Sequence, residues 1–348
     1  MKELIIHEGP RVEQINSPIP VPKDDEIVIE VVVAGCNPKD YKTYWVPKPI
    51  NQGDDIAGVV HQVGLKVLEF RPSDRVFALH QIQAPHGAYA EYAVASAATT
   101  AHLPPETSFE EAATIPLAAI TAALGLYRTL SLPPPWAPRT LPGPLLIYGG
   151  STAVGAFAIK LARAANLHPI MAVAGNGLGL VSSLLDSAAG DVALDYRNGP
   201  EQLQRDIGNA LTASHVKAAH AVFDAVSENA SWDACTPFLM ADTPLATVLP
   251  YPETAHLPGG TAQAQLVMSG DVHDVFGVKA GGRDFGYVMM RAFARGLQEG
   301  WFSGHPFEVV PGGLYGVQSG LERLSKGEVS AKKLVYRIEE TTGLRASS

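Results

Sequence analysis

The sequence predicts an α/β protein with two domains, one rich in β-strands and one built on a doubly wound parallel sheet. Three observations lead to this prediction. The first 100 residues hold short β-branched runs separated by Pro, Gly and Ser. From residue 145 onward, apolar strands alternate with helical segments, which is typical of a parallel sheet. An apolar run near the C-terminus again has the character of a strand.

The β-rich part is predicted from the spacing of its apolar residues. The run EIVIEVVV at residues 26–33 is β-branched and partly alternating, and residues 55–67 continue this pattern with breaks at Gly58 and Gly64. Further short strands are expected at residues 75–79 and 88–94, between turns. Together these segments predict a barrel-like β unit.

A helix is predicted after this β-rich part. Ser108 precedes an acidic turn and an Ala- and Leu-rich stretch, so we expect it to cap a helix that runs to about residue 130. Residues 132–144 read LPPPWAPRTLPGP, and this many prolines can sustain neither a helix nor a central strand. We expect a connector or surface loop there.

The second half of the chain alternates between strands and helices. Its segments, in chain order, are LLIYGG, STAVGAFAIKLARAAN, PIMAVAG, LVSSLLDSA, DVALDY, an amphipathic segment, AHAVFDAV and WDACTPFLM. A longer helix is expected at about residues 285–299. The tail then ends in KKLVYRIEE, a strand that we expect to return to the first domain. The predicted domains are therefore residues 1–118 with 303–348, and residues 119–302.

Composition and charge exclude several classes of protein. The chain of 348 residues is 46% hydrophobic, has a formal net charge of −9 and contains no dense run of Lys and Arg, so nucleic-acid binding is not expected. Its two cysteines, Cys36 and Cys235, are too few for a disulfide framework or a cysteine-rich zinc site. No apolar run reaches the roughly 20 residues that span a bilayer, and no export signal is visible. We therefore expect a cytoplasmic protein without a membrane segment.

The turn YGGSTAVG at residues 148–155 gives the first functional prediction. It follows a buried strand and opens an Ala-rich helix, a context in which backbone N–H groups can bind a pyrophosphate. Gly149 or Gly150 would allow the tight turn, and Gly155 would let the helix approach the sheet closely. The predicted contacts with a dinucleotide are Gly150, Ser151, Thr152, Ala153 and Val154. Turns of this kind also occur for packing alone, which is the alternative.

The end of the second strand bears on which dinucleotide is bound. An NAD enzyme usually places Asp or Glu there to hold the ribose hydroxyls. Residues 174–177 read AGNG, which supply no anion to repel a 2′-phosphate and no cation to bind one. Because no carboxylate is present to hold the ribose hydroxyls of NADH, NADPH is the cofactor that this turn excludes less strongly. Asn176 is a predicted contact with it. Tyr196, at the end of the next strand, either contacts the adenosine half or is a core tyrosine.

Six segments in order resemble the zinc-independent medium-chain dehydrogenases/reductases. They are AGCNPKDYK, NQGDDIAGVV, SDRVFAL, GAYAEYAV, SFEEAATIPLAAITAALGLY and YGGSTAVGAFAIKLA. Within that superfamily, GDDIAG, the Pro-rich insert and the tail HPFEVVPGGLYGVQSGLERLSKGEVSAKKLVYRI resemble the trans-acting enoyl reductases of fungal polyketide synthase clusters. The resemblance covers essentially the whole chain. It implies a GroES-like catalytic domain and a Rossmann cofactor domain.

The resemblance also implies that no catalytic metal is bound. Zinc-dependent relatives need a thiolate at the position of Asn37 and a His-Glu pair where Asp54 and Asp55 stand. Cys36 is adjacent, but it has no second thiolate or histidine pair at ligand spacing. We therefore expect it to be a small buried residue.

Enoyl reduction delivers a hydride to the β-carbon of a thioester-conjugated alkene, after which the enolate must be stabilised and protonated. The resemblance implies that Lys42 and Thr121 are catalytic, with Lys42 beside the nicotinamide ribose and the substrate carbonyl. Further cofactor contacts implied are Lys39, Asp40, Lys42, Val248, Leu249, Leu334 and Val335. Substrate contacts implied are Tyr44, Trp45, Leu117, Ala118, Ile120, Thr121 and Leu124. Each of these residues could also have a purely structural role. Lys42 could be a surface lysine, the residues at 117–124 a buried helix, the pairs at 248–249 and 334–335 core strands, and Tyr44 and Trp45 loop aromatics.

Three functions stay open at this point. The first is an NADPH-dependent, trans-acting enoyl reductase of an α,β-unsaturated polyketide thioester, docking transiently on the acyl carrier of a polyketide synthase. The second is a reductase of free enones or quinones, since the fold does not choose the substrate. The third is a non-redox family member that binds or cyclises a polyketide-derived product in the same cavity; the uncharged Asn176, Ser187 and Ala189 favour it slightly. Either a monomer or a homodimer is expected.

Overall fold

The computed structural model describes residues 1–42, 49–141, 143–228, 231–251, 264–274 and 280–343. The chain forms two compact units, residues 1–120 with 269–348 and residues 121–268. The second unit is thus an insertion into the first. The domain boundaries expected from the sequence stay a prediction; in the structure, residues 269–302 group with the first unit.

The second unit contains a six-stranded sheet in which every neighbouring pair is parallel. The strands, in chain order, are β8 (Leu145–Tyr148), β9 (Ile170–Ala174), β10 (Val192–Asp195), β11 (Ala221–Asp224), β12 (Leu245–Thr247) and β13 (Ala264–Leu266). Across the sheet they run β10-β9-β8-β11-β12-β13. This is the order of a doubly wound dinucleotide-binding sheet, and it confirms the predicted fold class.

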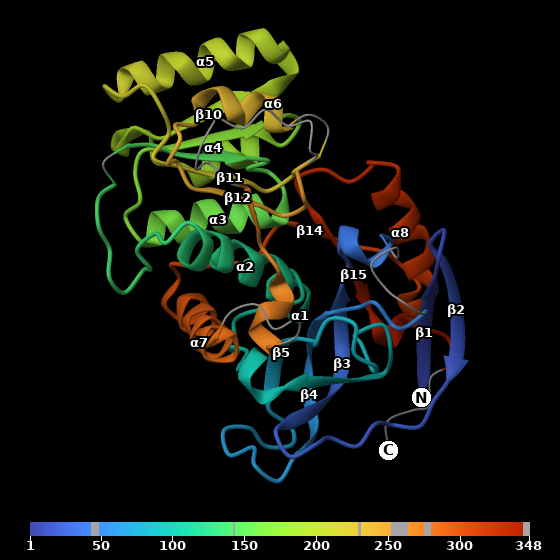
Figure 1. Cartoon of the computed structure of the whole chain (residues 1–348). Coiled ribbons are helices and arrows are strands. Elements are labelled where there is room, and N and C mark those ends of the chain that lie inside the picture. Colours follow the sequence, from blue (N-terminus) through green and yellow to red (C-terminus); the bar gives the residue numbers. More distant parts are fainter. Residues whose placement is uncertain (43–48, 142, 229–230, 252–263, 275–279, 344–348) are drawn as a thin grey trace. The chain divides into compact units, whose positions relative to one another are not determined.

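Helices cover both faces of this sheet. They are α3 (Ala153–Ala164), α4 (Leu178–Leu184), α5 (Pro200–Ala213) and α6 (Ser231–Cys235). In Figure 1, α5 and α6 lie on one face and α3 lies on the other. Helix α5 buries Leu203, Ile207 and Leu211, which recur every four residues and pack with Leu146 and Val222 of the sheet. This apolar stripe explains why the predicted amphipathic segment folds as a helix.

The first unit is built on a mixed seven-stranded sheet in the order β14-β15-β3-β4-β5-β7, with β6 beside β3. Its strands are β3 (Glu26–Gly35), β4 (Asp55–Val63), β5 (Arg75–Leu79), β6 (Tyr92–Ser96), β7 (Thr100–His102), β14 (Phe307–Val309) and β15 (Lys333–Arg337). A separate antiparallel pair is formed by β1 (Lys2–His7) and β2 (Arg11–Asn16). Strand β15 pairs antiparallel with β3, with Val335 opposite Gly35. The expected return of the C-terminal strand to the first unit is confirmed.

Several boundaries differ from the sequence prediction for local reasons. Strand β4 ends at Val63, one residue before Gly64, where an added Cβ would collide with the Lys23 carbonyl. Strand β6 begins only at Tyr92, because the residues before it form backbone hydrogen bonds with the N-terminal strand instead. For example, Leu4 N donates to Tyr89 O at 2.9 Å.

The helix expected over residues 108–130 is interrupted. It consists of α1 (Phe109–Ala112), α2 (Pro116–Ala123) and the π-helical segment η4 (Leu124–Thr129). Ser108 caps α1 as predicted, since its hydroxyl accepts from Glu111 N at 3.1 Å. Pro116 has no N–H to continue a helical ladder, so a new helix begins there.

The remaining helices belong to the first unit, and α7 begins three residues before the position expected from the sequence. They are α7 (Gly282–Glu299) and α8 (Val317–Ser325). Short helical turns lie at η1 (Pro38–Asp40), η3 (Ala97–Thr99), η5 (Ser187–Ala189), η6 (Tyr196–Asn198), η7 (Thr236–Phe238), η8 (Ser269–His273), η9 (Gly313–Gly316) and η10 (Ile338–Glu340).

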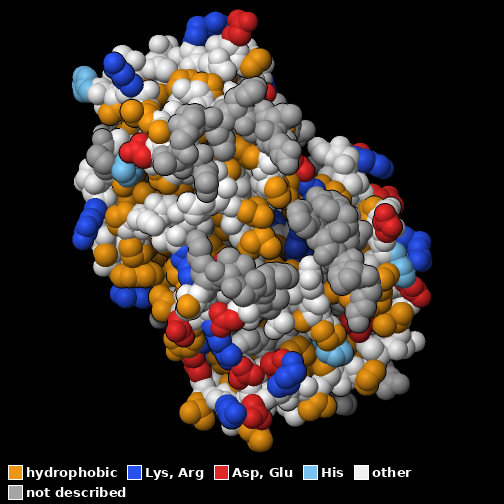
Figure 2. Space-filling view, viewed as in Figure 1, with side chains coloured by type: hydrophobic (Ala, Val, Ile, Leu, Met, Phe, Trp, Pro, Cys, Tyr) orange, Lys and Arg blue, Asp and Glu red, His pale blue; other side chains and the backbone are white. Residues whose placement is uncertain are grey.

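None of the described helices is both long and apolar enough to cross a membrane. On the face shown in Figure 2, acidic and basic side chains are interspersed.

Candidate active site and cofactor site

The turn after β3 carries the motif NPKDYK and is fixed by its own side chains. Asn37 precedes η1, Pro38 opens it, and Asp40 Oδ2 accepts from Asn37 N at 2.8 Å. Lys42 follows directly, with its backbone N–H donating to Lys39 O at 3.1 Å. The Lys42 ammonium lies 6.0 Å from the centre of the Tyr41 ring. The sequence therefore places Lys42 at the end of a short, internally bonded turn.

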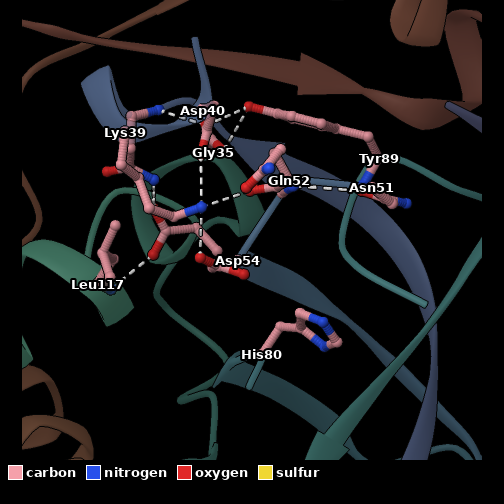
Figure 3. Close-up of polar contacts among 12 residues, drawn as sticks. Gly35, Lys39, Asp40, Asn51, Gln52, Asp54, His80, Tyr89 and Leu117 are labelled. Atoms are coloured by element: carbon pink, nitrogen blue, oxygen red, sulfur yellow. Dashed lines mark hydrogen bonds and ion pairs between the residues drawn. The ribbon is translucent and has the colours of Figure 1, made fainter. Parts of the chain in front are cut away.

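Lys39 joins two buried carboxylates (Figure 3). Its ammonium lies 2.9 Å from Asp40 Oδ1 and 2.6 Å from Asp54 Oδ2, and it donates to Gln52 O at 2.7 Å. The ammonium is thus hydrogen-bonded to the Gln52 carbonyl and forms ion pairs with both carboxylates. Burial lowers the pKa of Lys39, but Asp40 and Asp54 outweigh that effect and hold the pKa above its ordinary value. Lys39 is therefore charged at neutral pH.

The two carboxylates are shielded from water almost completely, being 0% exposed at Asp40 and 1% at Asp54. Burial raises the pKa of Asp40, while the Lys39 charge and the Tyr89 hydroxyl act in the opposite direction. Burial also raises the pKa of Asp54, against the charges of Lys39 and His80. The charge of Lys39 therefore favours the ionised form of both carboxylates, and the two carboxylates favour the charged form of Lys39.

Tyr89 and Asn51 hold this cluster from the other side. The Tyr89 hydroxyl donates to Asp40 Oδ2 at 2.6 Å. Asn51 Oδ1 accepts from Tyr89 N at 3.1 Å and from Gly53 N at 3.2 Å (Figure 3). Because Gly53 immediately precedes Asp54, the amide of Asn51 fixes the loop that brings Asp54 to Lys39.

Asp55 connects four segments of the first unit. Its carboxylate accepts from Asn37 Nδ2 at 2.6 Å, from Leu117 N at 2.7 Å and from Lys333 Nζ at 2.5 Å. These partners belong to the turn before η1, to the first turn of α2 and to β15. Asp55 therefore sets the start of α2 against the turn that carries Lys42.

The residues implied for substrate binding lie mostly on one helical stretch. Leu117, Ala118, Ile120 and Thr121 are in α2 and Leu124 opens η4; all five are buried. Tyr44 and Trp45 lie outside the described residues. Their contacts with a substrate stay a prediction, as does the catalytic role of Lys42 and Thr121.

The pair implied for the nicotinamide in the first unit is buried within β15. Leu334 and Val335 are 0% exposed, and the Leu334 carbonyl accepts from Cys36 N at 2.9 Å. In the second unit, Val248 and Leu249 directly follow β12, and Val248 N donates to Ser227 Oγ at 3.0 Å. Whether these backbone segments contact a nicotinamide stays a prediction.

The glycine turn has the geometry that a pyrophosphate needs. Gly149 adopts φ +79°, a region that favours glycine, and a Cβ on Gly155 would collide with the Gly149 carbonyl. Thr152 caps α3: its hydroxyl accepts from Gly155 N at 3.0 Å and donates to Gly149 O at 2.8 Å. Ala153 is the first residue of α3, where N–H groups have no carbonyl partner within the helix. These N–H groups fit an anion.

The structure gathers the other implied cofactor residues at the same edge of the parallel sheet. The glycine turn follows β8, Asn176 follows β9, Tyr196 follows β10, and Val248 follows β12. The carboxyl ends of parallel strands form the ligand-binding edge of such sheets. Tyr196 is 45% exposed and its ring stacks on Tyr148 with centroids 6.2 Å apart, so the alternative of a core tyrosine is wrong.

Sequence reasoning missed Arg197. Its Nη1 donates to Asn176 Oδ1 at 3.3 Å, so a cation does lie beside the turn that ends the second strand. The signal that could have found it is the pairing of β9 with β10, which sets Asp195 opposite Ala174 and therefore places the following residues together. Inspection of each turn separately cannot show this.

Comparison with known proteins identifies the family. Residues 23–105 match the alcohol dehydrogenase GroES-like domain. The chain is 40% identical to the trans-enoyl reductase fsr4 of Gibberella fujikuroi over 318 residues, covering 90% of this chain and 91% of that protein. It is also 31% identical to the trans-enoyl reductase resD of Aspergillus sclerotiorum, covering 93% and 96% of the two chains. The chain belongs to the trans-enoyl reductase family.

The fold of this trans-enoyl reductase family member is also that of solved medium-chain proteins. An alcohol dehydrogenase superfamily protein from Novosphingobium aromaticivorans superposes with a TM-score of 0.76 at 22% identity, covering 97% of this chain and 99% of that one. The predicted resemblance to medium-chain reductases, and to fungal trans-enoyl reductases within them, is confirmed.

Proposed function

We propose that the protein is an NADPH-dependent, trans-acting enoyl reductase that reduces an α,β-unsaturated polyketide thioester carried by a polyketide synthase. The observation that carries this proposal is the 40% identity, over nine-tenths of the chain, to a relative named as a trans-enoyl reductase. The glycine turn and the carboxyl-end edge of the parallel sheet support the use of a dinucleotide.

The pyrophosphate of the cofactor would be held by the first turn of α3. Ser151 adds a half-buried hydroxyl, and the N–H groups of Ala153 and Val154 add donors at the positive end of the helix dipole. Tyr196 offers a ring to the adenosine half. When bound, the nicotinamide would supply the hydride that adds to the β-carbon of the substrate.

Lys42 would stabilise the charge that this addition creates. Hydride addition at the β-carbon moves negative charge to the thioester oxygen, and an ammonium that donates a hydrogen bond there lowers the barrier. A proton must then reach the α-carbon to complete the saturated thioester. The polar atoms of Lys39 and Asp40 are bound within the buried network, so their side chains would position the turn of Lys42.

We also propose that the reaction is independent of zinc, on the basis of the charges present. At the positions implied for a ligand pair, Asp54 is paired with Lys39 at 2.6 Å and Asp55 with Lys333 at 2.5 Å. Asn37 donates its amide to Asp55. The chain's own ammonium groups therefore neutralise these carboxylates. No group of three or more potential metal ligands is found among the residues that the structure describes.

The substrate is reached through transient docking on an acyl carrier, and the protein would act in the cytoplasm as a monomer or homodimer. The buried free thiols of Cys36 and Cys235 agree with a reducing compartment. Light scattering would distinguish a monomer from a homodimer.

The proposal is tested with purified protein, NADPH and an α,β-unsaturated acyl thioester of N-acetylcysteamine, which mimics the carrier-bound chain. We expect loss of reduced-nicotinamide absorbance and a product two hydrogen masses heavier by mass spectrometry. Free enones and quinones of matched size are tested in parallel. Faster reduction of these would refute the thioester substrate, and a protein that binds product without binding either dinucleotide would refute the redox function.

A further inference from the structure

We propose that Arg197 recognises the 2′-phosphate of NADPH and thereby selects it over NADH. The inference rests on the proposed function, because it assigns a role within the same dinucleotide site. It begins from the contact between the Arg197 guanidinium and Asn176, residues that are 21 positions apart in the sequence.

The sheet places Arg197 where the ribose of the cofactor is expected. Strand β9 is the second strand of the doubly wound unit, and the end of that strand is where the ribose hydroxyls of a dinucleotide are read. Asn176 stands there in place of the carboxylate typical of NAD enzymes. Because Asp195 lies opposite Ala174, the chain after β10 brings Arg197 to within 3.3 Å of Asn176.

The guanidinium is oriented and yet accessible. Asp195 binds it in a forked geometry, accepting from Nε at 2.9 Å and from Nη2 at 2.7 Å, and the side chain of Arg197 remains 50% exposed. Each terminal nitrogen of a guanidinium carries two N–H groups. The contacts with Asp195 and Asn176 occupy one on each, so the second N–H of Nη1 and Nη2 can bind phosphate oxygens together.

The neighbouring side chains suit an adenosine 2′-phosphate as a whole. A Cβ on Gly175 would collide with the Tyr196 ring, so this glycine lets the tyrosine pack closely over the turn. The exposed ring and the guanidinium therefore stand next to each other, as the base and the 2′-phosphate do in the ligand. Asp195 forms an ion pair with the guanidinium at 2.7 Å, so a phosphate would bind the N–H groups that Asp195 leaves unoccupied.

Binding of nucleotide fragments tests this assignment without any turnover. Calorimetry of the full-length protein compares adenosine 2′,5′-bisphosphate, which carries the 2′-phosphate, with 5′-AMP, which lacks it. We expect the wild type to prefer the bisphosphate, and Arg197→Ala to lose about tenfold to hundredfold in affinity for it while binding 5′-AMP as before. Arg205→Ala is the control, since this exposed arginine on α5 pairs with Glu201. It should match the wild type.

A second comparison separates the inference from the function. The NADPH to NADH affinity ratio, followed by nicotinamide fluorescence, should fall in Arg197→Ala and be partly kept in Arg197→Lys. Normal NADPH binding in Arg197→Ala, or a wild type that prefers NADH, would overturn the role of Arg197 and leave the reductase function standing. A wild type that binds neither NADPH nor NADH would overturn the role of Arg197 and the reductase function together. In that case the protein should also fail to reduce the acyl thioester.

Discussion

The Lys39 ammonium lies 2.6 Å from the Asp54 carboxylate, and the same ammonium lies 2.9 Å from Asp40. One cation thus serves two carboxylates that are shielded from water. Removing one partner of a buried ion pair leaves an unpaired charge whose burial is costly, whereas an exposed pair contributes little. This part of the first unit should therefore depend on Lys39 for its stability.

Lys39→Met is expected to lower the free energy of unfolding by about 2–4 kcal/mol, because Asp40 and Asp54 lose their shared counter-charge. Urea denaturation followed by circular dichroism measures the change. Lys23→Met is the matched control, since the Lys23 side chain is 81% exposed in its pair with Glu26 and should cost less than about 1 kcal/mol. Adding Asp54→Asn to Lys39→Met should recover part of the loss. Equal effects of Lys39→Met and Lys23→Met would contradict the buried ion-pair network.

Tyr89→Phe should destabilise the protein by about 2 kcal/mol, because it removes a 2.6 Å hydrogen bond to the buried charge of Asp40. Tyr127→Phe removes a hydrogen bond to the neutral Leu161 carbonyl at 3.1 Å and should cost only about 1 kcal/mol. Both values come from the same denaturation experiment. If Tyr127→Phe destabilises the protein more than Tyr89→Phe does, then Tyr89 does not stabilise the charged form of Asp40.

Lys42→Ala is expected to leave the unfolding midpoint unchanged and to reduce turnover of the acyl thioester more than about tenfold, through loss of stabilisation of the enolate oxygen. Dissociation constants for NADPH should be measured on the same sample. Lys66→Ala is the control, because the Lys66 side chain is 75% exposed and pairs with Asp24 on the surface. An unchanged rate in Lys42→Ala would remove this residue from the site.

Gly155→Ala should cost about 1–3 kcal/mol and weaken dinucleotide binding, because its Cβ would meet the backbone carbonyl of Gly149. Gly179→Ala is a control in α4: nothing lies within 4 Å of its added Cβ, so it should be neutral or slightly stabilising. Thermal unfolding with and without NADPH reports both effects. Normal binding by Gly155→Ala would show that close approach of α3 to the turn is dispensable.

His273 should make the protein less stable in acid. Burial, aided by the charges of His80 and Arg283, lowers the pKa of His273 to about 4 from an ordinary value of 6.5. The unfolded chain therefore binds a proton below about pH 6.5 that the folded chain accepts only near pH 4. Stability should fall by about 3 kcal/mol across this range and level off below it.

His273→Asn removes this titration, so its stability should change less than that of the wild type between pH 7 and pH 4. Denaturant midpoints at closely spaced pH values give the comparison, with each protein serving as its own reference at pH 7. Parallel curves for the two proteins would show that other groups cause the acid sensitivity.

Local signals were sufficient for much of the fold. Strand β5 was placed at its observed bounds, Ser108 was found as a helix cap, and the glycine turn was recognised, because each depends on neighbours in the sequence. The interruption at Pro116 could have been found from the same kind of signal. These features need no knowledge of what packs against them.

The charged contacts could not be predicted in the same way. The pairing of Lys39 with Asp54 depends on how β4 enters the sheet beside β3, and that of Arg197 with Asn176 depends on the register of two parallel strands. Composition and periodicity do not fix such registers. A site made from side chains of different strands therefore becomes visible only in three dimensions.

The pairing of β15 with β3 has a consequence for how the chain is made. Strand β3 leaves the ribosome well before its neighbour at Val335, which lies far downstream in the sequence. The inserted unit, residues 121–268, is translated in full before that neighbour exists. Because domains fold as they emerge, nascent chains arrested near residue 300 should contain a protease-resistant insert and an incomplete N-terminal sheet.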